Sequence, residues 1–344
     1  MATAIRKAFC LRILAAVVLS SGALAPGTAP ARAQERPIVI KLATLAPRGS
    51  AWHAHLQDMG AGWSEASGGR VTLRIYPGGV AGEEADILRK MRIGQLHAGA
   101  LSLAGLQRIS TAVNVLAIPM LMDGPEDLAR VRAAMEPRIE ALLEDQGYVL
   151  LQWGDVGWLR FFLPTPEYRP DDVRKRKTPL WCEDATGAIW RENGFQSVVL
   201  NQADILPGLQ TGLIDAVGTT PLFILANQWF PFLPYMVEMP YIPLVGATLI
   251  DRRAWEEIPA QMRPELMRIS REAGALIQGE IYKLEADAIA AMEARGLQVI
   301  QPDPEIVEEW RELFRSSYDR LRGEMIPPEW FDEAVRVALS GGGG

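Results

Sequence analysis

Residues 37–65 read PIVIKLATLAPRGSAWHAHLQDMGAGWSE and contain the first regular elements of the chain. Residues 37–44 are an apolar run of strand length, and residues 47–50, Pro-Arg-Gly-Ser, have the composition of a loop. Residues 52–65 have the apolar spacing of an amphipathic helix. The stretch therefore predicts a strand, a loop and a helix in succession.

The same unit follows directly. Residues 71–76 alternate as a strand does, Pro77-Gly78-Gly79 ends the run, and residues 83–93 predict a helix that ends at Gly94. Strands separated by helices in this way are expected to be parallel, with the helices as crossovers.

Further along, short strands are predicted over residues 96–101 and 148–153, with a helix over 125–146 between them. From Gly157 the pattern restarts, with a strand over residues 158–163. The restart indicates a second domain.

The first residues have the organisation of an export signal. Arg6 and Lys7 precede an apolar stretch at residues 13–19, and Ala31-Arg32-Ala33 ends the segment. A membrane anchor is the alternative, but the apolar run is much shorter than the roughly 20 residues that a spanning helix needs. We therefore expect residues 1–33 to be a signal peptide, cleaved near Ala33, and the mature chain to lie in the periplasm.

The charge balance argues against a nucleic-acid partner. The chain has 35 Lys+Arg and 42 Asp+Glu, and residues 1–33 contain four cations and no acid, so the mature chain has 31 against 42, a net charge of −11. Of the two cysteines, Cys10 leaves with the signal, so Cys182 has no intramolecular disulfide partner.

The length of the mature chain predicts two domains, since roughly 310 residues exceed one usual core. We expect domain I over residues 34–153, with 240–262 returning to it, and domain II over 154–239, with part of 297–340. Residues 263–296 predict a helix that spans both domains, because the periodic segment within them, residues 264–295, would be about 48 Å long as a helix.

Catalytic and metal-binding groups are sparse in the sequence. His53 and His55 are two residues apart and would point to different faces of a helix, so they cannot bind a metal together as an i, i+4 pair does. Cys182 has no neighbouring base, and neither a Gly-x-Ser-x-Gly elbow nor a complete phosphate-binding loop occurs. The sequence predicts neither an enzyme nor a metal or other cofactor. The adjacent acids Glu83 and Glu84 are interpreted as a solvated helix face.

Aromatic residues concentrate between positions 153 and 241. Most are expected in an ordinary core, but residues 229–235, Trp-Phe-Pro-Phe-Leu-Pro-Tyr, are too interrupted by proline for a core helix or central strand. Some of these rings are therefore expected to face a cleft.

The order of these units resembles the DctP-type substrate-binding proteins of tripartite ATP-independent periplasmic (TRAP) transporters, over essentially the whole mature chain. The motifs that carry the resemblance are Leu42-Ala43-Thr44 with Pro47, Gly78-Gly79 with Glu83-Glu84, Met91-Arg92-Ile93-Gly94-Gln95, Pro170-Asp171-Asp172-Val173 and Leu209-Gln210-Thr211-Gly212-Leu213-Ile214-Asp215-Ala216. The resemblance implies a two-domain α/β periplasmic-binding-protein fold with mixed sheets, crossing hinge strands and a long bridging helix. It also implies a small organic ligand, enclosed by hinge closure and delivered to the small and large membrane subunits of a permease.

The chain departs from the family where a ligand carboxylate is usually bound. Family members carry an arginine in the strand after the Pro-Asp-Asp-Val lead-in, and that place is held here by Pro179, with Trp181 two residues on. Burying a dicarboxylate without a paired cation is unfavourable, whereas aromatic walls favour apolar contact. We therefore expect a ligand that is more apolar or aromatic than a C4-dicarboxylate. The expected ligand-binding residues are Trp181, Thr219, Arg160, Trp158, Trp229, Phe223, Gln202 and Trp52.

Two other functions fit the sequence. One is a periplasmic carrier of a hydrophobic or lipid-like molecule that hands its cargo to another soluble or membrane-associated protein, and most of the features above fit it as well. The other is an exported enzyme on the same scaffold, which the sparse catalytic groups disfavour.

Overall fold

The computed structural model describes residues 36–180 and 185–340. The predicted signal peptide, residues 1–33, and the predicted ligand-binding residue Trp181 lie outside these ranges. In the described ranges, no helix combines the length and the apolar character that crossing a membrane requires.

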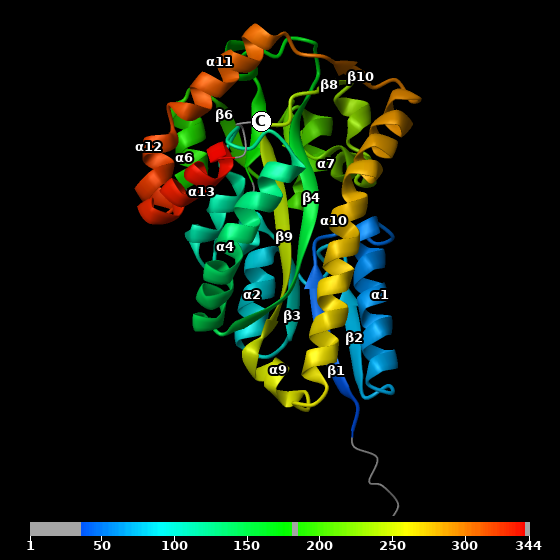
Figure 1. The fold of residues 1–344 in the computed structure, drawn as a ribbon. Helices are drawn as coiled ribbons and strands as arrows, with labels where there is room; N and C mark the ends of the chain where they lie inside the picture. Colours follow the sequence, from blue (N-terminus) through cyan, green and yellow to red (C-terminus); the bar gives the residue numbers. More distant parts are fainter. Residues whose placement is uncertain (1–35, 181–184, 341–344) are drawn as a thin grey trace, which may run out of the picture. The chain divides into compact units, whose positions relative to one another are not determined.

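The described strands form one large mixed sheet and one small parallel sheet (Figure 1). They are β1 (Ile38–Thr44), β2 (Val71–Tyr76), β3 (Ala98–Ser102), β4 (Tyr148–Leu163), β5 (Lys177–Leu180), β6 (Gln196–Val199), β7 (Val217–Thr219), β8 (Tyr235–Val237), β9 (Ile242–Asp251) and β10 (Gln298–Ile300). The large sheet has the order β10-β8-β4-β9-β3-β1-β2, with β7 also paired to β4, and the small sheet joins β5 to β6.

Strand direction changes along the large sheet. The pairs β1–β2 and β1–β3 are parallel, as the repeated strand–helix unit predicts. The pairs β3–β9, β4–β9, β4–β7 and β4–β8 are antiparallel. The expectation of mixed sheets in an α/β fold is confirmed.

The helices surround this sheet. The α-helices are α1 (Ala51–Ala66), α2 (Glu84–Arg92), α3 (Leu103–Leu106), α4 (Pro125–Asp145), α5 (Pro170–Val173), α6 (Ala185–Glu192), α7 (Gln202–Thr211), α8 (Pro221–Ala226), α9 (Arg252–Glu257), α10 (Arg263–Glu293), α11 (Pro304–Arg315), α12 (Tyr318–Arg320) and α13 (Pro328–Ser340). Two 3₁₀ segments, η1 (Thr111–Ala117) and η2 (Phe230–Phe232), and a π-helical turn, η3 (Leu321–Met325), complete the set.

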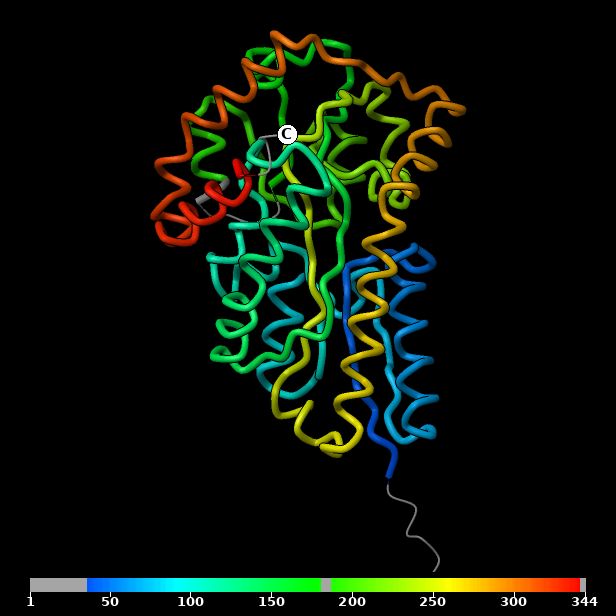
Figure 2. The backbone as a smooth tube through the Cα atoms, viewed as in Figure 1, coloured from blue at the N-terminus to red at the C-terminus, as the bar shows by residue number. Residues whose placement is uncertain are grey.

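The opening strand–loop–helix unit forms as its sequence predicts. Ser50 is the N-cap of α1, and its hydroxyl accepts a hydrogen bond from the His53 N–H. Helix α1 then lies beside α10 (Figure 2). Trp63 joins the two helices, because its indole N–H donates to the Leu266 carbonyl and the Ser270 hydroxyl, each at 3.0 Å.

Strand β4 runs as one element through the position where two strands were expected. The sequence predicted separate strands over residues 148–153 and 158–163, because Gly154 and Gly157 interrupt the run. The interruption is instead absorbed by an irregularity in the pairing with β9 between Asp155 and Gly157, and Gly157 has a φ of +110°. Consequently β4 pairs with β9 along its first part and with β7 and β8 near its end.

Helix α10 is 31 residues long and begins and ends close to the predicted positions. It contacts α1, β4 and α8, so it packs along elements from both the early and the middle part of the chain. Towards the C-terminus, α11 and α12 are separate helices with Ser316 and Ser317 between them.

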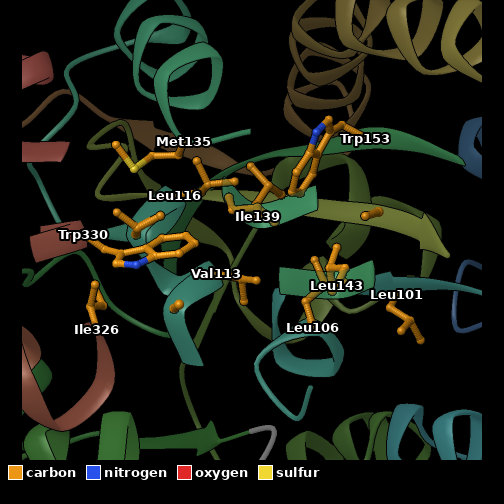
Figure 3. Packing of buried hydrophobic residues seen from close by; sticks show 14 of the residues in the cluster. Leu101, Leu106, Val113, Leu116, Met135, Ile139, Leu143, Trp153, Ile326 and Trp330 are labelled. Carbon is orange, nitrogen blue, oxygen red and sulfur yellow. The ribbon is translucent and has the colours of Figure 1, made fainter. Parts of the chain in front are cut away.

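The largest hydrophobic cluster lies where α4, η1 and the C-terminal segment meet the sheet (Figure 3). Leu116, Ile139 and Leu143 are fully buried in it, and Trp330 of α13 packs against the same group. Since Trp330 lies 187 to 214 positions after the other three residues, the C-terminal helix contributes to the core formed by the first half of the chain.

Candidate ligand cavity

A cavity of about 490 Å³ lies between two groups of elements. One group contains the loops and helix starts that follow β1, β2 and β3, and the other contains β7 and the starts of α7 and α8. One wall is formed by the β1–α1 connection, α1 and the starts of α2 and α3. The opposite wall is formed by the starts of α7 and α8 and by β7, while β4, β9 and α10 complete the enclosure. Its volume is within the range typical of sites for small organic molecules.

Four of the predicted ligand-binding residues line this cavity: Trp52, Gln202, Thr219 and Phe223. Trp52 belongs to α1 and Phe223 to α8, and their rings lie 6.3 Å apart between centroids. The Trp52 indole N–H also donates to the Asp155 carbonyl at 3.2 Å, which fixes the orientation of the ring. An aromatic pair contributed from opposite walls therefore forms part of the cavity surface.

Three predicted residues do not line the cavity. Trp158 and Trp229 are 4% and 2% exposed and belong to hydrophobic clusters. Trp229 supports the cavity from behind, since its ring meets Phe223 edge-on at 5.6 Å. The proline-broken segment thus places its tryptophan in the core, because η2 lets the chain turn without regular helix or strand pairing.

Arg160, the third of these residues, is held by acidic partners. Its Nε donates to Glu238 at 2.9 Å and its Nη1 to Glu285 at 3.5 Å, with a further bond to the Trp158 carbonyl at 3.3 Å. Pro179 is buried in β5 and is also absent from the cavity lining. Arg160 therefore does not place its guanidinium in the cavity, and Pro179 supplies no cation in its stead.

Arg108 is a lining residue that the sequence analysis missed. It follows α3, is exposed, and is the only Lys or Arg among the described residues that line the cavity. It attracts the nearby carboxylate of Glu84. Arg108 could not be predicted because it lies just beyond a four-residue helix, which is too short to show a helical period.

Glu84 corrects the interpretation of the Glu83-Glu84 pair as a solvated helix face. Glu84 is only 6% exposed, and its carboxylate accepts hydrogen bonds from the Ser102 N–H at 2.5 Å and the Ser102 hydroxyl at 2.8 Å. Burial raises the pKa of Glu84, and the two Ser102 hydrogen bonds oppose that rise. The residue joins the start of α2 to the end of β3 under the cavity.

Glu83 lies at the N-cap position of α2 and also lines the cavity. Burial raises its pKa, while a hydrogen bond from the Gln202 backbone N–H acts in the opposite direction. The Gln202 side chain donates to the Leu45 carbonyl at 3.5 Å. Residues of the two facing walls are thus hydrogen-bonded to one another.

The overall lining is apolar with a few polar groups. On the β4–β9 side, the Gln152 amide N–H donates to the Thr248 hydroxyl at 3.2 Å, and both side chains are buried. The described carboxylates in the lining are Glu83, Glu84 and Asp86, and Asp86 is paired with Arg89 at 2.8 Å. The described lining therefore carries one guanidinium, that of Arg108, one imidazole, that of His55, and three carboxylates.

Comparison with known proteins agrees with the architecture. The family of bacterial extracellular solute-binding proteins, family 7 (DctP), matches residues 42–324. The chain belongs to this family. The predicted family membership and two-domain fold class are confirmed.

Curated and solved relatives cover nearly the whole chain. The C4-dicarboxylate-binding periplasmic protein DctP of Rhodobacter capsulatus is 23% identical over 338 residues, which is 96% of this chain and 98% of the relative. A TRAP periplasmic solute-binding protein from Ralstonia eutropha H16, solved with (S)-2-acetolactate, has a TM-score of 0.82 at 19% identity and covers 88% of this chain and 99% of its own. The sugar acid binding protein DctPAm from Advenella mimigardefordensis, solved with galactonate, has a TM-score of 0.83 at 14% identity over 89% and 99%.

These relatives are solute-binding proteins of transport systems. At such identities the solved structures establish the fold of this DctP-family chain, and the ligands in their titles belong to those proteins. The position of the cavity between two sets of elements is the arrangement expected of a protein that encloses a small molecule.

Proposed function

We propose that this chain is the periplasmic solute-binding protein of a TRAP-type transporter, without catalytic activity, that captures a small organic ligand and delivers it to the membrane subunits. The observation that carries the proposal is the cavity of about 490 Å³ with Trp52 and Phe223 on facing walls. Membership of the DctP family supports the transport role.

The ligand is more apolar or aromatic than a C4-dicarboxylate. Arg160 is occupied by Glu238 and Glu285, and Pro179 stands where a carboxylate-binding arginine was expected. Arg108 can bind one carboxylate of the ligand, and the rings of Trp52 and Phe223 can contact its apolar part. The solved relatives hold polar acids, so this chain differs from them in ligand class.

Capture proceeds by closure of two domains about β4 and β9. We place domain I at residues 34–153 with 240–262, and domain II at 154–239 with part of 297–340. Support comes from the two strands, because β9 pairs with β3 while β4 pairs with β7 and β8. Helix α10, which contacts α1 and α8, follows the movement of both domains.

A thermal-shift and calorimetry series tests the ligand class. Phenylacetate, with one carboxylate and an aromatic body, should stabilise the protein, whereas succinate, with two carboxylates, should not. Phe223→Ala should weaken phenylacetate binding at least tenfold. The control is Phe232→Ala, since Phe232 is 40% exposed and does not line the cavity. Tighter binding of succinate than of phenylacetate contradicts the proposed ligand class.

A further inference from the structure

Strand β4 divides its residues between the cavity and the core at positions 153–156. Gly154 and Val156 line the cavity, whereas Trp153 and Asp155 are buried and are not among its lining residues. Successive residues of a strand point to opposite faces of the sheet, and this alternation is what the strand produces. The same stretch of backbone therefore belongs both to the cavity wall and to the packing behind it.

Helix α4 holds the two buried side chains. The carboxylate of Asp155 is paired with Arg132, and the two residues are 5% and 7% exposed. The Trp153 indole N–H donates to the Glu136 carboxylate at 2.9 Å, and the Arg132 guanidinium lies 5.9 Å from the centre of the Trp153 ring. Trp153 also packs in the largest hydrophobic cluster (Figure 3). This part of β4 is thus fixed to α4 through side chains that do not line the cavity.

The backbone of the same stretch holds Trp52 from the facing helix. The Trp52 indole N–H donates to the Asp155 carbonyl at 3.2 Å, over a separation of 103 residues. The pairing of β4 with β9 is irregular between Asp155 and Gly157, so the regular ladder alone does not set the direction of this carbonyl. The ion pair of Asp155 with Arg132 supplies the missing restraint. Since an indole has a single N–H donor, Trp52 offers the cavity only its carbon surface.

We propose that Asp155 and Arg132 are positioning residues for ligand binding: their buried ion pair fixes the Asp155 carbonyl and, through it, the ring of Trp52 in the cavity wall. The inference rests on the proposed function and deepens it, because Trp52 then gives the ligand apolar contact and no hydrogen bond. Neither Asp155 nor Arg132 lines the cavity, so their effect on ligand affinity is indirect.

Fluorine NMR of the ligand-free protein labelled with 5-fluorotryptophan tests the positioning of the ring. The Trp52 signal is identified by its absence from the spectrum of Trp52→Phe. Asp155→Asn keeps the size of the side chain but removes its charge, so the Trp52 signal should move by more than its own linewidth. Arg132→Lys keeps the charge without the planar guanidinium and serves as the second variant if Asp155→Asn does not fold. A Trp52 signal that stays in place in the folded variant overturns the inference.

Arg138→Gln is the matched control. Arg138 is also on α4, and its guanidinium lies 4.3 Å from the ring centre of a different tryptophan, Trp330. The substitution should leave the Trp52 signal in place. If Arg138→Gln moves the Trp52 signal as far as Asp155→Asn does, the signal reports a general change in α4 and the proposal is wrong.

Calorimetry with phenylacetate separates positioning from a merely structural role. Asp155→Asn should weaken binding by about threefold or more in the chain that has Trp52, and it should have no further effect in Trp52→Phe, which keeps a ring but has no N–H to hold. Equal losses of affinity in both backgrounds overturn the positioning role. If the unaltered protein does not bind phenylacetate, the proposed ligand class fails, whereas the fluorine signal still decides the positioning, so the two failures are distinguishable.

Discussion

Glu285 of α10 lies against β4 beside Gly157 and Trp158, and its ionisation is expected to make stability fall as pH rises. Its carboxylate is 4% exposed, accepts the Trp158 N–H at 3.2 Å and lies 3.5 Å from Arg160. Burial raises the pKa of Glu285 to about 7, although the attraction of Arg160 opposes the rise and the charge of Glu238 adds to it. The variant Glu285→Gln preserves the shape of the side chain and removes the titration.

The direction of the pH effect follows from the protonation of Glu285 in the folded and unfolded chains. Between pH 4.5 and 7 the folded chain holds a proton on Glu285 that the unfolded chain has released, so the free energy of unfolding falls as pH rises. At 1.36 kcal/mol per pKa unit, the contribution lost between pH 5 and pH 8 is about 2.5 kcal/mol. Above the folded pKa the loss is complete and the contribution no longer changes.

Urea unfolding followed by circular dichroism from pH 5 to pH 8 measures this effect. The free energy of unfolding of Glu285→Gln minus that of the unaltered protein should rise by about 2.5 kcal/mol across the range. Asp287→Asn is the matched control, because Asp287 is on the same helix and is exposed. Parallel pH curves for the unaltered protein and Glu285→Gln would show that Glu285 does not titrate with a raised pKa in the folded chain.

Three further predictions concern single positions. Gly157→Ala should lower stability by more than about 2 kcal/mol in urea unfolding, because the new Cβ would lie 2.0 Å from a Glu285 carboxylate oxygen at a φ of +110°; a loss below about 0.5 kcal/mol contradicts this. Arg132→Ala should lower the free energy of unfolding by about 3–5 kcal/mol in the same assay, since it leaves the buried carboxylate of Asp155 unpaired. Combining Arg132→Ala with Asp155→Asn should recover part of that loss, and no recovery argues against the pairing. Trp52→Ala should weaken phenylacetate binding at least tenfold by calorimetry, because the cavity loses one member of its aromatic pair; unchanged affinity places the ligand elsewhere.

Much of the fold could be predicted because its elements are locally encoded. The apolar spacing of residues 37–65 predicted β1 and α1 to within two residues. The helical periodicity of residues 263–296 predicted α10. The continuity of β4 could not be predicted, since it depends on pairing with β9 some 90 residues later, which carries the chain through Gly157. The short helices α3, α8 and α9 were missed because four to six residues do not establish a period.

The candidate site was predictable only in part, for a related reason. An aromatic residue such as Trp52 or Phe223 contributes apolar surface to a site whichever residues lie next to it, so its residue type alone supports a prediction. The role of a charged residue depends on partners distant in sequence. Arg160 was expected to meet a ligand, but Glu285, 125 residues later, binds it instead. Glu84 was expected to be solvated, but its carboxylate accepts hydrogen bonds from the N–H and the hydroxyl of Ser102.

The ligand class can be read from the molecule that stays bound during purification. Native mass spectrometry of the protein purified without added ligand, followed by extraction and identification of any small molecule that remains bound, measures it. We expect one molecule per chain with an apolar or aromatic body and no more than one carboxylate. Recovery of a small dicarboxylate at that stoichiometry would show that the proposed ligand class is wrong.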